Sequence, residues 1–136
     1  SQAAIRNGLD NAPVPGALTN LKRVAEALET IRLHFCRPVI VSSGYRSEAV
    51  NKAIGGSPSS AHRFGLAADF TVQGVPNVEV CRWIAEHSKD MGVDQVIYEF
   101  GPRGWIHIGL ADQPRHETLT AVLAAGKTVY RPGIIG

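Results

Sequence analysis

The chain has 136 residues, a length typical of one domain that buries about two-thirds of its unfolded surface and needs no stabilising cross-links. Hydrophobic residues make up 44% and charged residues 19%, and no apolar run is long enough to cross a bilayer, which excludes a disordered or membrane-spanning chain. The formal net charge of +2 is too small to indicate a nucleic-acid partner. We therefore expect one globular domain over residues 1–136.

The first part of the chain predicts an irregular arm, a long helix and a short strand. Residues 1–16 are rich in turn-forming residues, so we expect them to run over the surface as an irregular N-terminal arm. Apolar residues recur at steps of three and four over residues 17–35, which predicts an amphipathic helix. Pro38 ends this helix, and the β-branched run over residues 39–41 predicts a buried strand.

The remaining sequence alternates helix and strand signals. Ser47 is placed to cap a short helix, and Asn77 is placed to cap a longer amphipathic helix that ends before Gly92. A Gly-Pro-Arg-Gly segment between two apolar runs indicates a hairpin. This order favours an α+β domain with a small, mostly antiparallel sheet and helices packed on one side. Besides the helix from Asn77, the expected elements are helices over 48–54 and 116–125 and strands over 66–72, 96–100 and 105–110.

The two cysteines, Cys36 and Cys81, lie far apart in sequence. Both fall in apolar surroundings that are typical of helix faces. We expect two buried free thiols, and a single disulfide between them is the alternative.

The five histidines divide into two groups. His34 and His87 lie near helix ends and His116 lies in a polar loop, positions typical of solvated side chains. His62 follows a Gly- and Ser-rich loop and precedes a strand. His107 lies within the apolar strand segment Trp-Ile-His-Ile-Gly, where a His is either buried or lines a cleft. Taken alone, His107 is more typical of a hydrogen-bonded core histidine than of a metal ligand.

Asp69 is the third candidate ligand, because it interrupts the apolar run Ala-Ala-Asp-Phe. An unpaired buried carboxylate is costly, so Asp69 must find a cation, a network of donors or a metal ion. With His62 and His107, it would form a set of two histidines and one carboxylate. Three protein ligands and an open fourth position are typical of catalytic zinc. The sequence has no His-Glu-x-x-His helix, so spacing alone leaves a paired structural Asp as the alternative.

These segments resemble the zinc D-Ala-D-Ala carboxypeptidase family of peptidoglycan peptidases, in the branch common in bacteriophage lysins. The resemblance covers residues 1–110 and implies a hedgehog/D-Ala-D-Ala peptidase-like fold with one Zn²⁺ ion held by His62, Asp69 and His107. It also implies that Arg46 contacts the substrate and supports catalysis. Tyr45 and Ser60, in the same motifs, are further candidates for substrate contact. The segments that carry the resemblance are Ser42 to Ser47, Ser60-Ala61-His62, Asp69 and Trp105-Ile106-His107.

The general base does not follow the usual spacing of this family. Many relatives carry an acid three residues before the last His, and Gly104 stands at that position here. Glu99, on the preceding strand, is the nearest acid and our predicted base. If Gly101 lies opposite Gly104 in a tight turn, Tyr98 lies opposite His107 and Glu99 points to the other face. A five-residue loop or a bulge would instead place Glu99 opposite His107.

The resemblance therefore implies a zinc metallopeptidase that acts on peptidoglycan stem peptides or cross-links. Three activities share these motifs: D,D-carboxypeptidase, D,D-endopeptidase and L-alanyl-D-glutamate endopeptidase. We expect a monomer that acts on the bacterial cell wall, in the periplasm, outside the cell or delivered by a phage, although no signal-peptide pattern opens the sequence. Two alternatives stay open. One is a non-catalytic cell-wall-binding or structural module, and the other is a purely structural zinc site with His116 as a fourth ligand.

Overall fold

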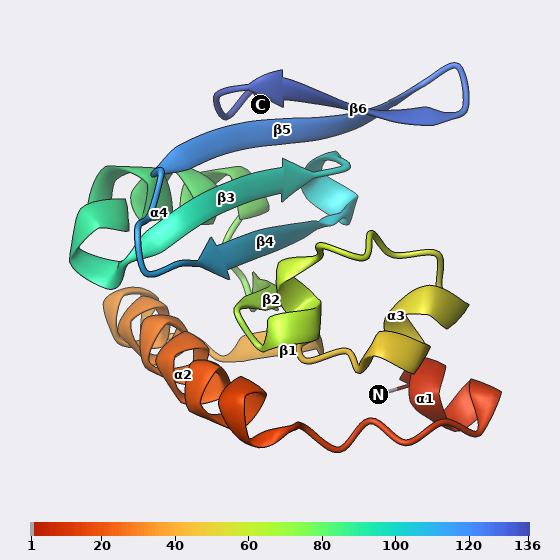
Figure 1. The fold of residues 1–136 in the computed structure, drawn as a ribbon. Helices are drawn as coiled ribbons and strands as arrows, with labels where there is room; N and C mark the ends of the chain where they lie inside the picture. The colour runs from red at the N-terminus through yellow and green to blue at the C-terminus, as the bar shows by residue number, and fades with distance from the viewer. Residues whose placement is uncertain (1) are drawn as a thin grey trace.

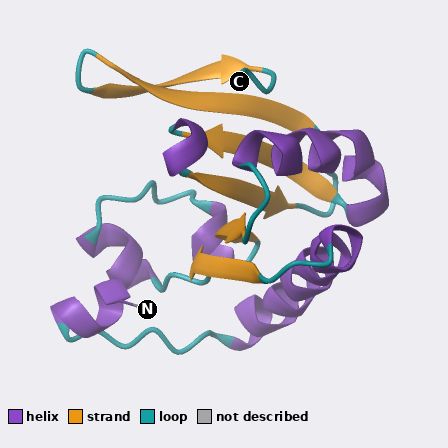
Figure 2. Ribbon diagram, turned by 180° about the vertical axis from the view of Figure 1, so that it is seen from behind, coloured by secondary structure: helices purple, strands orange, loops and turns teal. Residues whose placement is uncertain are grey.

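The structure is a computed structural model that describes residues 2–136. Its centre is a six-stranded sheet with the strand order β1-β2-β4-β3-β5-β6. Helix α4 lies behind the sheet in the view of Figure 1 and in front of it in Figure 2, and α2 lies below it in both views. The helices are α1 (Gln2–Asn7), α2 (Pro15–Phe35), α3 (Glu48–Ala53) and α4 (Asn77–Met91), with 3-10 helices η1 (Ala61–Phe64) and η2 (Gly101–Arg103). The strands are β1 (Val39–Ser43), β2 (Ala67–Val72), β3 (Val93–Glu99), β4 (Trp105–Leu110), β5 (Glu117–Ala124) and β6 (Lys127–Pro132).

The core lies between one face of the sheet and the helices α2 and α4. Phe70 of β2, Ile106 and Ile108 of β4 and Val96 of β3 are fully buried on this face. They pack in one cluster with apolar side chains of the two helices, such as Ile31. Side chains alternate between the two faces of a strand, so the residues between them point to the opposite, open face. Asp69 and His107 are among these residues.

The sheet is mixed and larger than the sequence predicted. Strand β5 pairs in parallel with β3, and β6 folds back antiparallel on β5. The helix expected over residues 116–125 is therefore wrong. Ala and Leu in this segment suggested a helix, but pairing along β3 overrides such weak preferences. Ala125 and Gly126 both have positive φ, 51° and 77°, as the tight turns of two-residue hairpins require.

Two other expectations for the first forty residues need correction. Residues 1–16 are not wholly irregular, because Gln2–Asn7 forms α1. Gly8, at φ 62°, ends this helix, and its N–H donates to the Ile5 carbonyl at 3.2 Å. Strand β1 is not buried either: Ile40 and Val41 are each about half exposed, because β1 is the edge strand of the sheet.

The two predicted helix starts at Ser47 and Asn77 have different outcomes. Ser47 caps α3 as expected, and its Oγ accepts a hydrogen bond from the Val50 N–H at 3.3 Å. Helix α4 begins at Asn77, but the residue at the cap is Pro76. The Asn77 side chain instead donates to the Gly104 carbonyl at 3.1 Å and so ties the β3–β4 loop to α4.

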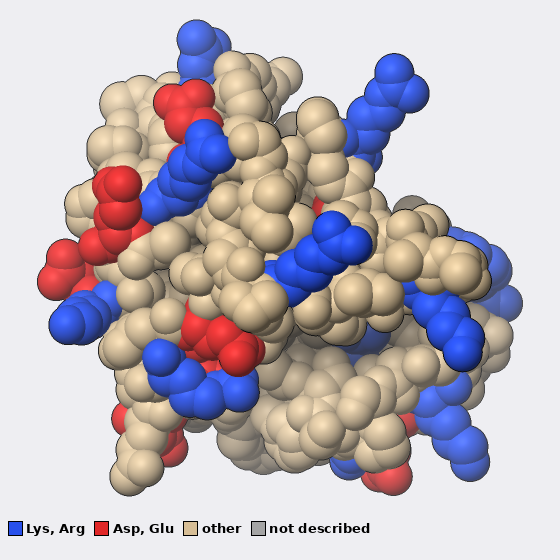
Figure 3. Space-filling view, turned by 90° about the horizontal axis from the view of Figure 1, so that it is seen from above, with Lys and Arg blue, Asp and Glu red and all other residues tan. Residues whose placement is uncertain are grey.

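The cysteines and the surface complete the description of the fold. Both thiols are free; Cys81 is buried as expected, whereas Cys36 is exposed at the end of α2. Among the described residues, no helix combines the length and apolar character needed to cross a bilayer. Figure 3 shows one face of the molecule, on which Lys and Arg side chains are scattered and do not form a single patch.

Candidate metal centre and catalytic site

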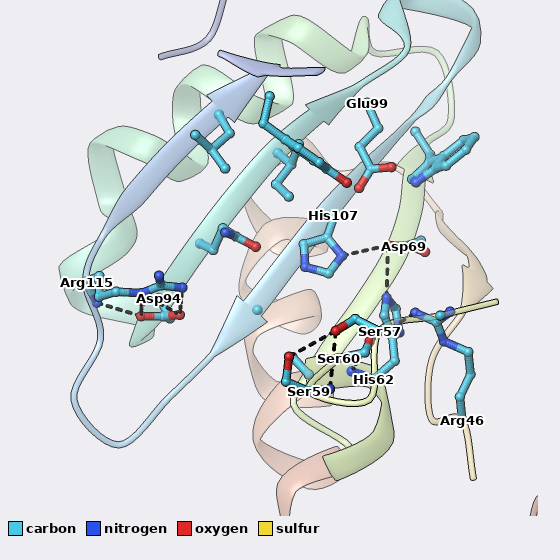
Figure 4. Close-up of a pocket in the computed structure, with 18 residues that line it drawn as sticks. Arg46, Ser57, Ser59, Ser60, His62, Asp69, Asp94, Glu99, His107 and Arg115 are labelled. Atoms are coloured by element: carbon cyan, nitrogen blue, oxygen red, sulfur yellow. Dashed lines mark hydrogen bonds and ion pairs between the residues drawn. The ribbon is translucent and has the colours of Figure 1, made fainter. Parts of the chain in front are cut away.

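Three side chains from separate elements meet on the open face of the sheet (Figure 4). Asp69 of β2 lies directly opposite His107 of β4, and His62 comes from η1. The Asp69 Oδ1 atom lies 2.9 Å from His107 Nδ1 and 3.3 Å from His62 Nε2. One potential ligand atom of each residue lies within 4.8 Å of the other two. The structure thus brings together the three predicted metal ligands.

The spacing of these atoms fits a small tetrahedral metal ion. Nitrogen and oxygen ligands bind Zn²⁺ at about 2.0–2.1 Å, which places tetrahedral ligands roughly 3.3 Å apart. The observed separations of 2.9 and 3.3 Å are close to this value. The Nδ1 of His62 lies 2.7 Å from the Gly44 carbonyl and donates to it in the tautomer that leaves Nε2 free. Such a hydrogen bond orients a histidine for metal binding.

Local backbone geometry explains why His62 lies over the sheet. Ser60 begins η1, and its Oγ accepts a hydrogen bond from the His62 N–H at 3.3 Å. Gly65 ends η1 at φ 71°, a conformation that favours glycine. A Cβ at Gly65 would also lie only 2.5 Å from the Ala17 carbonyl oxygen of α2. The tight approach to α2 holds the His62 ring in place, with 2% of the residue exposed.

The electrostatics of the cluster favour an ionised Asp69. Burial alone would raise the pKa of Asp69, but hydrogen bonds from His107 and His62 outweigh this effect and hold the pKa well below its usual range. The Asp69 backbone carbonyl also accepts a hydrogen bond from the Ser42 hydroxyl at 3.2 Å. The carboxylate is therefore anchored and negatively charged, as a metal ligand must be.

The β3–β4 hairpin places Glu99 on the same face as the cluster. Glu99 pairs with Trp105 and Ile97 pairs with His107, so neither register considered from the sequence is the observed one. Five residues, 100–104, connect the strands and include η2. In this register Glu99 lies two residues along β3 from Ile97, the partner of His107, so Glu99 and His107 face the same side of the sheet. Tyr98, which the tight-turn register would have placed opposite His107, instead points to the core and is buried.

Gly104 is required by this loop. A Cβ at Gly104 would overlap the carbonyl oxygen of Glu99. The position that carries an acid in many relatives therefore cannot carry a side chain here without moving the loop. The carboxylate of Glu99 reaches the pocket from the neighbouring strand.

The environment of Glu99 shifts its proton affinity upward. Burial raises the pKa of Glu99 and the nearby Asp69 carboxylate adds to this rise, while His107, Trp105 and Arg46 oppose it. The Trp105 indole N–H is buried and has no well-aligned hydrogen-bond partner in the described part of the chain. We take it as a weak donor directed toward the Glu99 carboxyl. A carboxylate with a raised pKa is a better proton acceptor near neutral pH.

Arg46 lies on the His62 side of the cluster, away from Glu99 (Figure 4). Its backbone N–H donates to the His62 carbonyl at 3.0 Å, and Nη2 donates to Ser60 Oγ at 3.3 Å. Burial lowers the pKa of Arg46, and the carboxylates of Asp69 and Glu99 oppose this shift. The Nε–H is buried and has no partner among residues 2–136, so the guanidinium retains hydrogen-bonding capacity for a ligand.

A model of the Peptidase M15 family matches residues 1–109. The chain belongs to this family. M15 peptidases are zinc-dependent hydrolases, and the cluster of His62, Asp69 and His107 is a group that could bind this metal. A search of curated proteins finds no match.

The pocket of this M15 peptidase extends beyond the predicted residues. Its volume is about 700 Å³, within the usual range for ligand sites. Arg46 and Ser60 line it with the three potential ligands and Glu99. Tyr45 does not line it and borders a separate hollow with Asn11, so its contact with substrate stays a prediction. The lining also includes Gly56, Ser57, Ser59, Ala61, Asp94, Gln95, Ile97, Trp105, Gly109, Arg115, Leu119 and Tyr130.

Several of these residues were not predicted from the sequence, because they come after residue 109, where the M15 match ends. Arg115 forms a bidentate ion pair with Asp94 at the far end of the pocket, with Nη2 2.8 Å from Asp94 Oδ2. Leu119 and Tyr130 come from β5 and β6, a region expected to be helical. The signal for a strand in the sequence was the β-branched residue at every second position over residues 118–122, Thr-Leu-Thr-Ala-Val.

The remaining histidines lie apart from the metal cluster. His34, Trp83 and His87 form an aromatic stack, with ring centroids 4.3 and 4.4 Å apart. The Nδ1 of His116 lies 3.0 Å from the Val93 carbonyl. His116 does not belong to the cluster in the described residues, so the structure gives no support to a fourth protein ligand.

Proposed function

We propose that this M15 peptidase uses zinc to hydrolyse peptide bonds in the stem peptides or cross-links of bacterial peptidoglycan. The observation that carries the proposal is the placement of three metal-binding side chains in one pocket with Glu99 and Arg46. Figure 4 shows Glu99 on one side of the His107–Asp69 pair and Arg46 on the other, beside His62. A substrate in this pocket would lie between a proton acceptor and a cation.

The reaction needs a metal ion and two groups of the chain. When bound, zinc would polarise the scissile carbonyl and make water more acidic. Glu99 accepts a proton from the attacking water at its carboxylate and returns it to the amine that leaves. Arg46 offers positive charge and free donors to the negative charge that develops on the peptide, or to a terminal carboxylate of the substrate. Ser60 holds the guanidinium through the Nη2 hydrogen bond.

Within this class we propose a D,D-carboxypeptidase or an endopeptidase. Arg46 suits a substrate with a free terminal carboxylate, as a carboxypeptidase requires. The pocket also continues past His107 to Asp94 and Arg115, which leaves room for a peptide that extends on both sides of the cleaved bond. We further propose that the protein works as a monomer on the cell wall.

Digestion of purified peptidoglycan tests the proposal and identifies the bond. The zinc-loaded protein is incubated with cell walls, and the muropeptides are analysed by mass spectrometry for new termini. A His62→Ala variant, loaded and treated in the same way, is the matched control. New termini that appear with the wild type and not with the variant support the proposal. Their absence, with the protein co-sedimenting with cell walls, would instead favour the non-catalytic binding module.

A further inference from the structure

The C-terminal hairpin forms one wall of the pocket, although it lies beyond the residues that match the family. Strands β5 and β6 span residues 117–132, and the family match ends at residue 109. Leu119 of β5 and Tyr130 of β6 nevertheless line the same pocket as His62, Asp69 and His107. The hairpin thus adds side chains to the site that the family motifs do not include.

Tyr130 belongs to a row of residues that crosses four strands at the level of Glu99. Trp105 pairs with Glu99, Glu99 pairs with Ala121, and Ala121 pairs with Tyr130. Paired residues of neighbouring strands point to the same face, so Tyr130 faces the metal cluster. Ala121 stands between Glu99 and Tyr130 and is fully buried. Its small side chain leaves room for the Tyr130 ring to lie over it toward Glu99.

The electrostatics of Tyr130 agree with this placement. Burial raises the pKa of Tyr130, and the carboxylates of Glu99 and Asp69 raise it further, so the hydroxyl keeps its proton at neutral pH. The residue is still 54% exposed. Its hydroxyl makes no hydrogen bond to another residue of the 2–136 region, which leaves it available as a donor to a ligand.

Donors are unevenly distributed around the cluster. Arg46 offers a guanidinium on the His62 side. On the Glu99 side, the indole N–H of Trp105 is buried and directed toward the Glu99 carboxyl, with which it interacts weakly. Tyr130 is the residue on that side with an accessible hydroxyl. A peptide that crosses the cluster presents carbonyl oxygens on both sides of the cleaved bond, and those on the Glu99 side need a donor.

We propose that Tyr130 is a substrate-contacting residue whose hydroxyl donates a hydrogen bond to the bound peptide on the Glu99 side of the metal cluster. This inference rests on the proposed peptidase function. It assigns the C-terminal hairpin a role in substrate binding, opposite Arg46. Ile97 and Leu119, which line the pocket next to this row, give the same wall an apolar surface suited to small side chains such as the methyl group of alanine.

Kinetics of a Tyr130→Phe variant test the proposal, because the change removes only the hydroxyl. The substrate is a peptidoglycan pentapeptide fragment, and kcat and KM are measured at saturating zinc. We expect kcat/KM to fall roughly tenfold, the usual weight of one hydrogen bond, with unchanged zinc affinity and melting temperature. Tyr98→Phe is the matched control, because it removes a hydroxyl from the opposite, core face of the sheet. It should keep the wild-type kcat/KM.

A second readout needs no turnover. Calorimetry measures binding of the same fragment to the zinc-loaded Glu99→Gln variant, with and without Tyr130→Phe. Weaker binding in the double variant supports the contact, even if the wild type cleaves no peptidoglycan and the peptidase function fails. If the wild type cleaves and both readouts stay within twofold, the peptidase function stands and the inference about Tyr130 is overturned. A loss of zinc affinity or of thermal stability in Tyr130→Phe would also overturn it, because the residue would then be structural.

Discussion

Replacement of Glu99 by Gln should separate catalysis from stability. The change keeps the shape of the side chain and removes the proton acceptor. A general base contributes roughly 10²–10⁴-fold to the rate, so we expect kcat/KM to fall by that factor, or about 3–5 kcal/mol of transition-state stabilisation. Zinc content should not change, because Glu99 is not among the three residues of the cluster.

The same substitution should not destabilise the metal-free protein. The Glu99 carboxylate has no ion-pair partner in the described residues, and its pKa is raised above the ordinary value of 4.5, first by burial and then by Asp69. As the pH rises above 4.5, the unfolded chain loses this proton before the folded one, so the folded state loses stability over that range. Neutral Gln avoids this loss, and we expect an equal or higher melting temperature at pH 7.

The assay combines muropeptide cleavage, metal analysis and thermal denaturation of the same preparations. A Glu99→Gln variant that keeps its activity would refute the assignment of Glu99 as the base. A variant that loses activity and also has a lower melting temperature or a lower zinc content would refute the reasoning too, because Glu99 would then have a structural role in the site. Only the loss of activity in a stable, zinc-loaded protein fits the geometry.

Three further predictions concern the metal, the hairpin and the thiols. In His62→Ala, zinc per chain measured by atomic absorption should fall from about one ion to almost none, and wild-type content would exclude His62 as a ligand. Gly104→Ala should lower the free energy of unfolding by on the order of 2 kcal/mol in denaturant titrations, because its Cβ overlaps the Glu99 carbonyl; a neutral effect would contradict the loop geometry. Burial raises the pKa of Cys81 to about 12, whereas Cys36 is exposed. Iodoacetamide should therefore label Cys36 in the folded protein and Cys81 only after unfolding, and equal labelling would refute this difference.

The candidate metal ligands could be predicted because their signals are local. Asp69 interrupts an apolar strand, where an unpaired carboxylate is costly, and the structure pairs it with His107 directly across β2 and β4. His62 precedes the same strand by a few residues, at the end of a loop rich in Gly and Ser. A short motif on each of three segments was therefore enough to suggest that they converge.

The C-terminal hairpin could not be predicted in the same way, because it depends on distant pairing. Strand β5 forms by lying parallel to β3, more than twenty residues earlier in the chain, and its own sequence suits a helix. The turn at Ala125 and Gly126 lacks the Asn-Gly or Asp-Gly pair that most strongly signals a tight hairpin. The contribution of Tyr130 to the pocket was therefore invisible in the sequence.

The position of the acid shows why spacing along the chain is a weak guide to this site. A carboxylate three residues before His107 would lie at position 104, in the loop that precedes β4, where a Cβ overlaps the Glu99 carbonyl. Glu99 lies five residues before position 104 in the sequence. It pairs across the hairpin with Trp105, and Trp105 is two residues before His107 on β4. Side chains two residues apart on a strand share a face, so Glu99 and His107 project into the same pocket. The pocket thus constrains where a carboxylate lies in space, and in this chain β3 supplies it. A Gly104→Glu substitution should accordingly fail to restore activity to the Glu99→Gln variant in the cleavage assay. The reason is that the loop disrupted by a side chain at position 104 also positions the end of β3. Restored cleavage would show that the loop can accommodate an acid three residues before His107, as in many relatives.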